Sequence, residues 1–220
     1  MYSKHQQSQY DECLVCQTPL VKKISLVQLI HPLPVCIDCL EQFEIIDYHI
    51  DFHHYPLHIL YRYNEFFKTL LFQYKGLYDQ ALKDAFLCIF QSKMIQKYRE
   101  HIVVVAPSTS LENQMRGFAP MEMIASTFSS HIFTGLYKKE KYKQSQMTYD
   151  KRQQAVNKIG IHHGEMLRNQ KVLILDDVIT SSATLNACLS LVLAYNPKSV
   201  ELLVLSTKKL KEELRFEEGG

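Results

Sequence analysis

Four cysteines near the start of the chain form two closely spaced pairs. Cys13 and Cys16 make up one Cys-x-x-Cys unit, and Cys36 and Cys39 make up a second unit about twenty residues later. Each unit can offer two thiolates to one ion, and two units complete the tetrahedral four-sulfur shell that suits zinc. Because four thiolates leave no open coordination position, the pattern predicts a structural zinc site and not a catalytic one.

The rest of the sequence favours zinc over a disulfide or a redox pair. Residues 1–7 lack the apolar segment of a signal peptide, and no run approaches the roughly 20 apolar residues of a membrane helix. We therefore expect a cytoplasmic protein, in which thiols stay reduced. Neither pair follows a predicted strand and begins a helix, as a redox pair would. Cys88 and Cys188 lie in apolar helical stretches and are predicted to be buried core thiols.

The charge around the paired cysteines argues against a direct contact with nucleic acid. Residues 1–50 carry three lysines against six acidic side chains, and four thiolates with one Zn²⁺ are negative as well. A surface of that sign repels phosphate. We therefore expect this region to stabilise the fold or to dock a partner. The whole chain has a formal net charge of only +2, so its overall charge does not indicate a nucleic-acid binder either.

A second group of reactive side chains begins at Asp176. The apolar run Val172–Leu175 is followed by the adjacent carboxylates of Asp176 and Asp177, and then by a turn that leads into a predicted helix. Ligands of open α/β sheets sit at the carboxyl ends of strands, and backbone N–H groups at a helix start favour phosphate. The two carboxylates can accept hydrogen bonds from sugar hydroxyls or help to hold magnesium. The turn adds the hydroxyls of Thr180, Ser181, Ser182 and Thr184.

An acid pair at the end of an apolar strand also occurs in protein classes that fit this sequence less well. ATPases carry such a pair, but none of the seven glycines here precedes the Lys-Ser or Lys-Thr of a phosphate-binding loop. A response regulator or a phosphatase would not account for the hydroxyl-rich turn. In the simplest alternative, Asp176 and Asp177 only end a strand and begin a turn.

The elements that must position these residues predict an α/β domain. Short apolar runs rich in β-branched residues alternate with helical patterns, which indicates a mainly parallel, doubly wound sheet covered on both faces. The chain has 220 residues, of which 46% are hydrophobic and 22% charged, and this excludes a disordered or collagen-like protein. We expect a four-cysteine zinc-finger module over residues 1–50 and the α/β domain over 51–220. Strands are predicted at 57–63, 102–106, 132–137, 171–175 and 200–205, and helices at 65–74, 78–98, 121–128 and 183–194.

The segment from Val172 to Leu185 resembles the phosphoribosyl pyrophosphate (PRPP) loop of the type I phosphoribosyltransferases. With the four-cysteine pattern, it makes nearly the whole chain similar to the ComF, or ComFC, family, whose phosphoribosyltransferase-like members are linked to DNA uptake in natural competence. The resemblance implies a type I phosphoribosyltransferase-like sheet that binds PRPP, or a related ribose phosphate, with magnesium. It assigns the ribose hydroxyls to Asp176 and Asp177. It assigns the 5′-phosphate to Thr180, Ser181, Ser182, Ala183 and Thr184.

Three further segments carry the resemblance. Val104–Ser108 resembles the strand and loop that face the pyrophosphate, and Arg116-Gly117-Phe118 matches the Arg-Gly-Phe signature of the family. Gln144-Ser145, followed by Arg152, is similar to a later family segment. Arg116 and Arg152 are thereby implied to contact the pyrophosphate side. Tyr74-Lys75-Gly76 fits the Lys-Tyr-x-Gly region of the family only loosely.

Three residues depart from the family pattern and keep two hypotheses open. Ser182 stands where the loop usually has glycine, and Ala119 and Ala155 stand where asparagines are expected. A non-glycine residue at positive φ costs about 1 kcal/mol or more, so we expect weaker phosphate binding. An active protein would displace pyrophosphate at the anomeric carbon of the sugar, as a glycosyltransferase. The alternative is a non-catalytic module with a vestigial phosphate site, which docks a DNA-translocating helicase or a DNA-handling protein.

A basic stretch runs from Lys138 to Arg152. It has six basic and two acidic residues, with tyrosines between them. Such a stretch could contact pyrophosphate or single-stranded DNA, on whose bases the tyrosines would stack. An ordinary solvated loop accounts for the composition equally well.

Four histidines cluster near the expected domain boundary, at His49, His53, His54 and His58. Their i, i+4 spacing would assemble a metal site on a helix. Tyr55-Pro56 and the strand pattern that follows argue against a helix here, so the sequence does not predict a ligand role for them.

Overall fold

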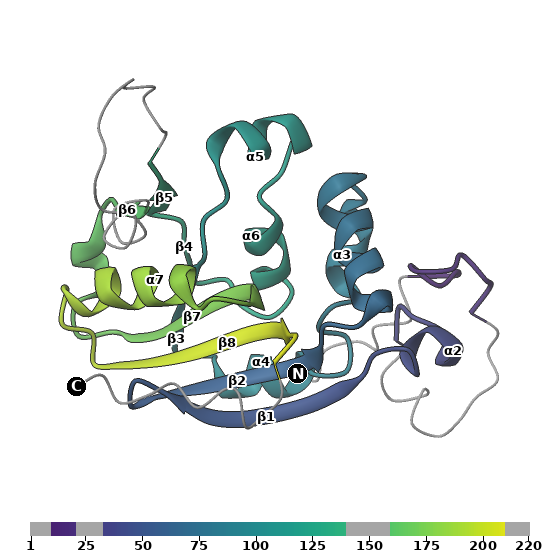
Figure 1. Cartoon of the computed structure of the whole chain (residues 1–220), viewed down its shortest axis with the longest axis horizontal. Coiled ribbons are helices and arrows are strands. Elements are labelled where there is room, and N and C mark those ends of the chain that lie inside the picture. Colours follow the sequence, from purple (N-terminus) through teal and green to yellow (C-terminus); the bar gives the residue numbers. More distant parts are fainter. Residues whose placement is uncertain (1–9, 21–32, 140–158, 210–220) are drawn as a thin grey trace, which may run out of the picture.

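A computed structural model of the chain describes residues 10–20, 33–139 and 159–209. Its central element is a six-stranded sheet, with helices above and below it (Figure 1). The first pair in the sheet is antiparallel and all other neighbouring strands are parallel, which confirms the mainly parallel α/β fold. In spatial order the strands are β1 (Ile45–Phe52), β2 (Tyr55–Arg62), β8 (Ser199–Thr207), β7 (Lys171–Ile179), β3 (His101–Val105) and β4 (Ile132–Phe133).

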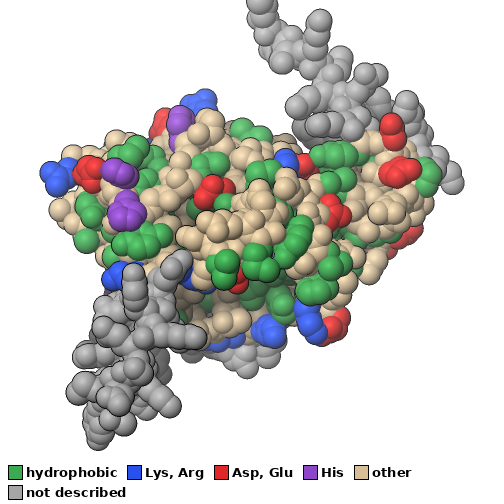
Figure 2. Space-filling model, turned by 90° about the horizontal axis from the view of Figure 1, so that it is seen from above, with side chains coloured by type: hydrophobic (Ala, Val, Ile, Leu, Met, Phe, Trp, Pro, Cys, Tyr) green, Lys and Arg blue, Asp and Glu red, His purple; other side chains and the backbone are tan. Residues whose placement is uncertain are grey.

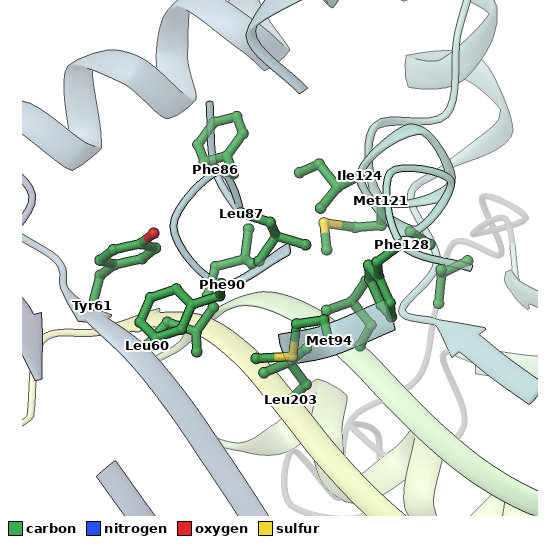
Figure 3. Close-up of a cluster of buried hydrophobic side chains, with 14 of the residues drawn as sticks. Leu60, Tyr61, Phe86, Leu87, Phe90, Met94, Met121, Ile124, Phe128 and Leu203 are labelled. Atoms are coloured by element: carbon green, nitrogen blue, oxygen red, sulfur yellow. The ribbon is translucent and has the colours of Figure 1, made fainter. Parts of the chain in front are cut away.

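One face of the sheet is covered by the elements that follow β2 and β3. Alternate strand residues such as Leu173, Leu203 and Leu205 point into this core. Aromatic side chains such as Phe86 and Phe90 lie among aliphatic ones in it (Figure 3). The ring centroids of Phe86 and Phe67 are 5.7 Å apart. Each fully buried side chain of this size contributes about 1.5–3 kcal/mol by leaving water. The covering elements are α3 (Glu65–Gly76), η1 (Gln80–Asp84), α4 (Gln91–Lys97) and α6 (Pro120–Ala125).

The opposite face is covered mainly by α7 (Ala183–Leu193). Its residues Leu185, Cys188 and Val192 pack against the remaining strand side chains, among them Ile174 and Val204. Cys188 is buried there, as predicted, whereas Cys88 is only half-buried in the turn between η1 and α4. The other described elements are α2 (Ile37–Leu40), α5 (Ser110–Arg116), η3 (Gly164–Leu167) and a small antiparallel ribbon formed by β5 (Leu136–Lys138) and β6 (Ile159–Ile161).

The structure departs from the expected elements in several places. The strand predicted at 132–137 is divided into β4 and β5, which belong to different sheets, and neither β1 nor α5 was predicted. The helix predicted at 78–98 is the short η1, an irregular turn and α4. The apolar residues of this segment, including Leu82, Phe86 and Phe90, do not share one helical stripe, and only a broken path brings all of them into the core. The strand predicted at 171–175 continues to Ile179, because β8 pairs with it through Ile179↔Thr207.

The cysteine-bearing segment packs against the domain (Figure 1). Cys13, Val35 and Cys39 are buried together with Ala85, and the Tyr10 hydroxyl donates to Asp84 Oδ2 at 2.6 Å. Residue 50, the expected boundary, falls inside β1. The division into a module over 1–50 and a domain over 51–220 therefore stays a prediction. No helix in the described part of the chain is long and apolar enough to cross a membrane.

Candidate functional site

The acid pair lies near the end of β7, at the carboxyl edge of the parallel sheet. Asp176 is 9% exposed, and its Oδ1 accepts the Asp177 backbone N–H at 2.9 Å. The Asp177 Oδ1 accepts the Val178 N–H at 2.9 Å. The structure thus places both acids within β7 and not after it, with one carboxylate buried and its neighbour partly open to solvent.

Lys75, at the end of α3, forms an ion pair with the Asp177 Oδ2. Burial pushes the pKa of Asp177 up, but the Lys75 ammonium and the hydrogen bonds to the carboxylate hold it below its usual range. Burial and the neighbouring charge of Asp177 raise the pKa of Asp176 well above its usual range. The two neighbours therefore differ in protonation tendency, with Asp177 the ionised acceptor of the pair.

Arg116 joins the same group from α5. Its Nε donates to the Lys75 carbonyl oxygen at 2.9 Å, and its side chain is 15% exposed. Gly117 follows in the left-handed region, with φ 75°, so the chain can end α5 and turn the next residue inward. Phe118 then packs against Tyr74, at a ring distance of 5.3 Å.

Lys75 was not among the site residues predicted from the sequence. Tyr74-Lys75-Gly76 is the loosest of the segments that resemble the family, and no local signal connects it with an acid pair about a hundred residues later. The structure makes that connection in two contacts, because Lys75 pairs with Asp177 and also accepts from Arg116. Lys75 therefore contacts both Asp177 and Arg116, the two residues that were predicted to belong to the site.

The hydroxyl-rich turn leads directly into the N-terminus of α7. Thr180 and Ser181 are exposed, and Ser182 and Thr184 are half-buried. Ser182 has φ 59° and ψ 0°, so it adopts the left-handed conformation that the glycine of the family loop would adopt without strain. The backbone of Ser182 thus has the positive φ at which a non-glycine residue is strained, whereas weaker phosphate binding stays a prediction. The Ser182 side chain forms no cap hydrogen bond to α7.

A small cavity of about 40 Å³ lies at the end of β3, beside the segment expected to face pyrophosphate. Ala106, Pro107 and Ser108 line it, together with Ala119 and Asn113. The Asn113 Oδ1 is buried and has no hydrogen-bond partner in the described part of the chain. Arg152, Gln144-Ser145 and most of the basic stretch Lys138–Arg152 lie outside the described residues.

The four paired cysteines come together as the sequence predicts. Their sulfur atoms all lie within 4.8 Å of one another, and the Cys16 and Cys36 sulfurs are 3.6 Å apart. Tetrahedral zinc with Zn–S bonds of about 2.3 Å requires sulfurs roughly 3.8 Å apart, so the cluster is compatible with a structural zinc ion. The Cys13 sulfur also accepts backbone N–H groups from Val15 at 3.4 Å and Cys36 at 3.3 Å, which stabilises a thiolate.

Residues 81–216 match the sequence model of the phosphoribosyl transferase domain. This range covers more than half of the chain, from η1 through β8, and it contains the acid pair, the turn and Arg116. The chain belongs to the phosphoribosyl transferase domain family. The family match also confirms the type I phosphoribosyltransferase-like fold class. The four cysteines and Lys75 lie before the matched range.

The chain is also similar to a curated protein, Competence protein ComFC of Streptococcus pneumoniae (strain ATCC BAA-255 / R6). The two sequences are 27% identical over 146 residues. That region is 66% of this chain and 66% of the relative, so the chain matches just under two thirds of the length of ComFC. The match confirms the resemblance to the ComF/ComFC family.

A search of solved structures finds phosphoribosyltransferases with low similarity to this chain. A hypoxanthine phosphoribosyltransferase from Staphylococcus aureus has a TM-score of 0.37 at 14% identity, over 57% of this chain and 62% of that chain. A purine phosphoribosyltransferase from Pyrococcus horikoshii Ot3 has a TM-score of 0.37 at 17% identity, over 57% and 73% of the two chains.

Proposed function

We propose that this chain binds PRPP, or a related ribose 5-phosphate derivative, at the carboxyl edge of its parallel sheet. The proposal is supported mainly by one observation. Lys75 contacts both Asp177 and Arg116, and the acid pair is followed directly by the Ser182 turn at the start of α7. Asp176 and Asp177 offer acceptors for sugar hydroxyls, and the N-terminus of α7 offers N–H donors to the 5′-phosphate. Lys75 and Arg116 supply positive charge on the side where a pyrophosphate would extend.

Magnesium fits the donor chemistry of this edge. Mg²⁺ is usually held by one or two carboxylates together with substrate phosphates, and Asp176 and Asp177 are the carboxylates available here. When bound, the ion would neutralise the pyrophosphate charge. The chain's own residues would orient the ribose. The ribose hydroxyls would take the place of the Lys75 ammonium at the Asp177 Oδ2. In turnover, pyrophosphate would leave the anomeric carbon while an acceptor forms a bond to it, and the fixed charges would stabilise the developing cation.

Calorimetric titration tests this binding. PRPP with Mg²⁺ is expected to bind the wild-type chain, and Asp177→Ala is expected to weaken binding about 100-fold, because a bidentate acceptor and the partner of Lys75 are both lost. Asp51→Ala removes an exposed carboxylate from β1 and is the matched control, with unchanged affinity. Absence of heat with the wild type would sink the proposal. Equal affinities for the wild type and Asp177→Ala would show that Asp177 does not contribute to PRPP binding.

We further propose a cytoplasmic role in DNA uptake, in keeping with the name of the ComFC relative and with a compartment that keeps thiols reduced. The acidic cysteine-bearing segment would dock a DNA-translocating helicase or another DNA-handling protein. Single-stranded DNA would instead contact the basic stretch Lys138–Arg152. On the face seen in Figure 2, basic and acidic side chains are interspersed, so the described residues add no broad basic patch there.

Replacement of Lys141, Lys143 and Lys151 by glutamine tests the DNA contact. If the stretch binds single-stranded DNA, the affinity measured by fluorescence anisotropy is expected to fall at least about 10-fold in low salt, and the salt dependence to become shallower, because fewer counterions are released. Lys93, Lys97 and Lys171, replaced together by glutamine, give a charge-matched control from the described domain. A wild-type chain that binds no oligonucleotide, or an equal loss in the control, would contradict the contact.

A further inference from the structure

The antiparallel hairpin of β1 and β2 brings together side chains that are far apart on any helix. His49 and His58 are direct cross-strand partners in its register. Their rings stack, with centroids 4.0 Å apart and planes inclined by 19°. The i, i+4 spacing considered from the sequence therefore plays no part here, because the hairpin pairs residues nine positions apart in the chain.

A carboxylate completes this cluster. The register of β1 shifts between Ile45 and Tyr48, and within this bulge Asp47 adopts φ 42°. Its Oδ1 consequently faces both rings, 2.5 Å from the His58 Nε2 and 3.6 Å from the His49 Nε2. One ligand atom from each of the three residues lies within 4.8 Å of the other two.

We propose that Asp47, His49 and His58 form a second, three-ligand site for a divalent transition-metal ion of the zinc class, separate from the four cysteines. Two imidazoles and one carboxylate are a common donor set for zinc with an open fourth position. Tetrahedral ligands around zinc lie about 3.4 Å apart, a spacing that the Asp47–His49 pair already has to within a few tenths of an ångström. His58 and Asp47 are held closer, by a hydrogen bond that the ion would replace.

The burial of His58 supports a role for its Nε2. The side chain is 3% exposed, and its Nδ1 is buried with no hydrogen-bond partner in the described part of the chain. Its polar contacts there are those to Asp47 and the stacked ring of His49. An aliphatic residue would fill the same space without leaving a nitrogen unsatisfied.

A cavity of about 220 Å³ adjoins the two histidines and offers space for a fourth ligand. His49, His58, Lys97 and Glu201 are among the residues that line it. The His49 side chain is 56% exposed, so its ring can turn from the stacked position into the plane that coordination requires. Lys93 lies 3.9 Å from the Asp47 Oδ2, the oxygen that faces away from the rings. It therefore orients the carboxylate from outside the proposed site.

Zinc titration of protein that already carries one zinc per chain tests the site. After excess metal has been removed, calorimetry is expected to show one further equivalent of Zn²⁺. His49→Ala and Asp47→Asn are each expected to weaken that equivalent at least about 10-fold, since even the loss of an outer-shell partner costs this much. His54→Asn is the matched control, because His54 is an exposed histidine of the same hairpin and asparagine tolerates its φ of 67°.

Cobalt distinguishes the two sites in the same protein. Co²⁺ added as the second equivalent is expected to give visible ligand-field bands without thiolate charge-transfer absorption, and the first zinc is expected to stay bound. The proposal is overturned if no second equivalent binds, if it binds equally well to both ligand variants, or if the His54→Asn control loses it to the same extent. Asp47 is hydrogen-bonded to the buried His58, so circular dichroism of each variant is used to test whether a lost equivalent reflects unfolding.

Discussion

Removal of zinc from the four cysteines, by a chelator or by Cys39→Ser, is expected to unfold residues 33–43 and to destabilise the domain beside them. Metal binding is worth on the order of 10 kcal/mol to a region this small. Without it, Cys39 and Val35 would lose their packing against Ala85, and the Tyr10–Asp84 hydrogen bond would open. The Phe43 ring packs edge-on against Phe66 and at a tilt against Tyr61 of the main core, so the damage is expected to extend into that core.

Thermal melting and amide hydrogen exchange, each with and without a chelator, measure this effect. Metal analysis should first give one zinc per chain in the purified protein. Cys188→Ala is the matched control, since it removes a buried thiol on α7, on the other face of the sheet, and should leave the response to chelator unchanged. Complete removal of zinc with no change in melting, or in exchange over residues 33–43, would contradict a structural role for the metal.

Lys75→Met is expected to destabilise the protein by about 3 kcal/mol at neutral pH, because the Asp177 carboxylate loses its partner in a largely buried place. Lys75 holds the folded-state pKa of Asp177 down, so the stability of this pair is present above the unfolded pKa of about 3.9 and is lost as the pH falls through the folded value. In the variant, burial raises that pKa instead. The deficit should therefore be largest near pH 7, shrink as the pH falls through the raised pKa of Asp177 in the variant, and disappear below the lowered folded-state pKa of the wild type.

Urea unfolding at several pH values checks this expectation. The double variant Lys75→Met/Asp177→Asn is expected to recover most of the stability, since it no longer buries an unpaired charge. Lys68→Met on the same helix is the control: it breaks an exposed pair with Glu65 and should change stability by less than about 1 kcal/mol. A Lys75→Met deficit that does not depend on pH would show that packing, and not the ion pair, explains the loss.

The sequence was most informative where a residue's role is set by its close neighbours in the chain. The alternation of apolar strands and helices, the paired cysteines and the acids of β7 all carry local patterns, and the structure shows each of them. Ser182 was noticed because it departs from such a pattern, and the structure shows it at φ 59°, the left-handed conformation that glycine adopts most easily. Asp176 and Asp177 were expected just beyond a strand, and only the pairing of β7 with β8 shows that the strand includes them.

The contacts that the sequence did not predict depend on chain segments that meet only in the fold. Lys75 reaches Asp177 across 102 positions, and no periodicity of α3 marks it as a site residue. His49 and His58 become neighbours through the register of a hairpin whose first strand, β1, was not predicted, because its alternation includes the charged Asp47 and Asp51. The break between η1 and α4 likewise follows from packing on several sides of one segment.

The parallel pairing of β2 with β8 has a consequence for the order in which the protein folds. Leu57 pairs with Leu202, and the Arg62 guanidinium donates to the Lys209 carbonyl oxygen, 147 residues later. The β1–β2 hairpin closes over a two-residue turn, whereas its place in the sheet exists only after β8 has been synthesised. Such long-range pairing gives a high contact order and slow folding. An early hairpin must therefore wait, with an unpaired edge, for the last strand of the sheet.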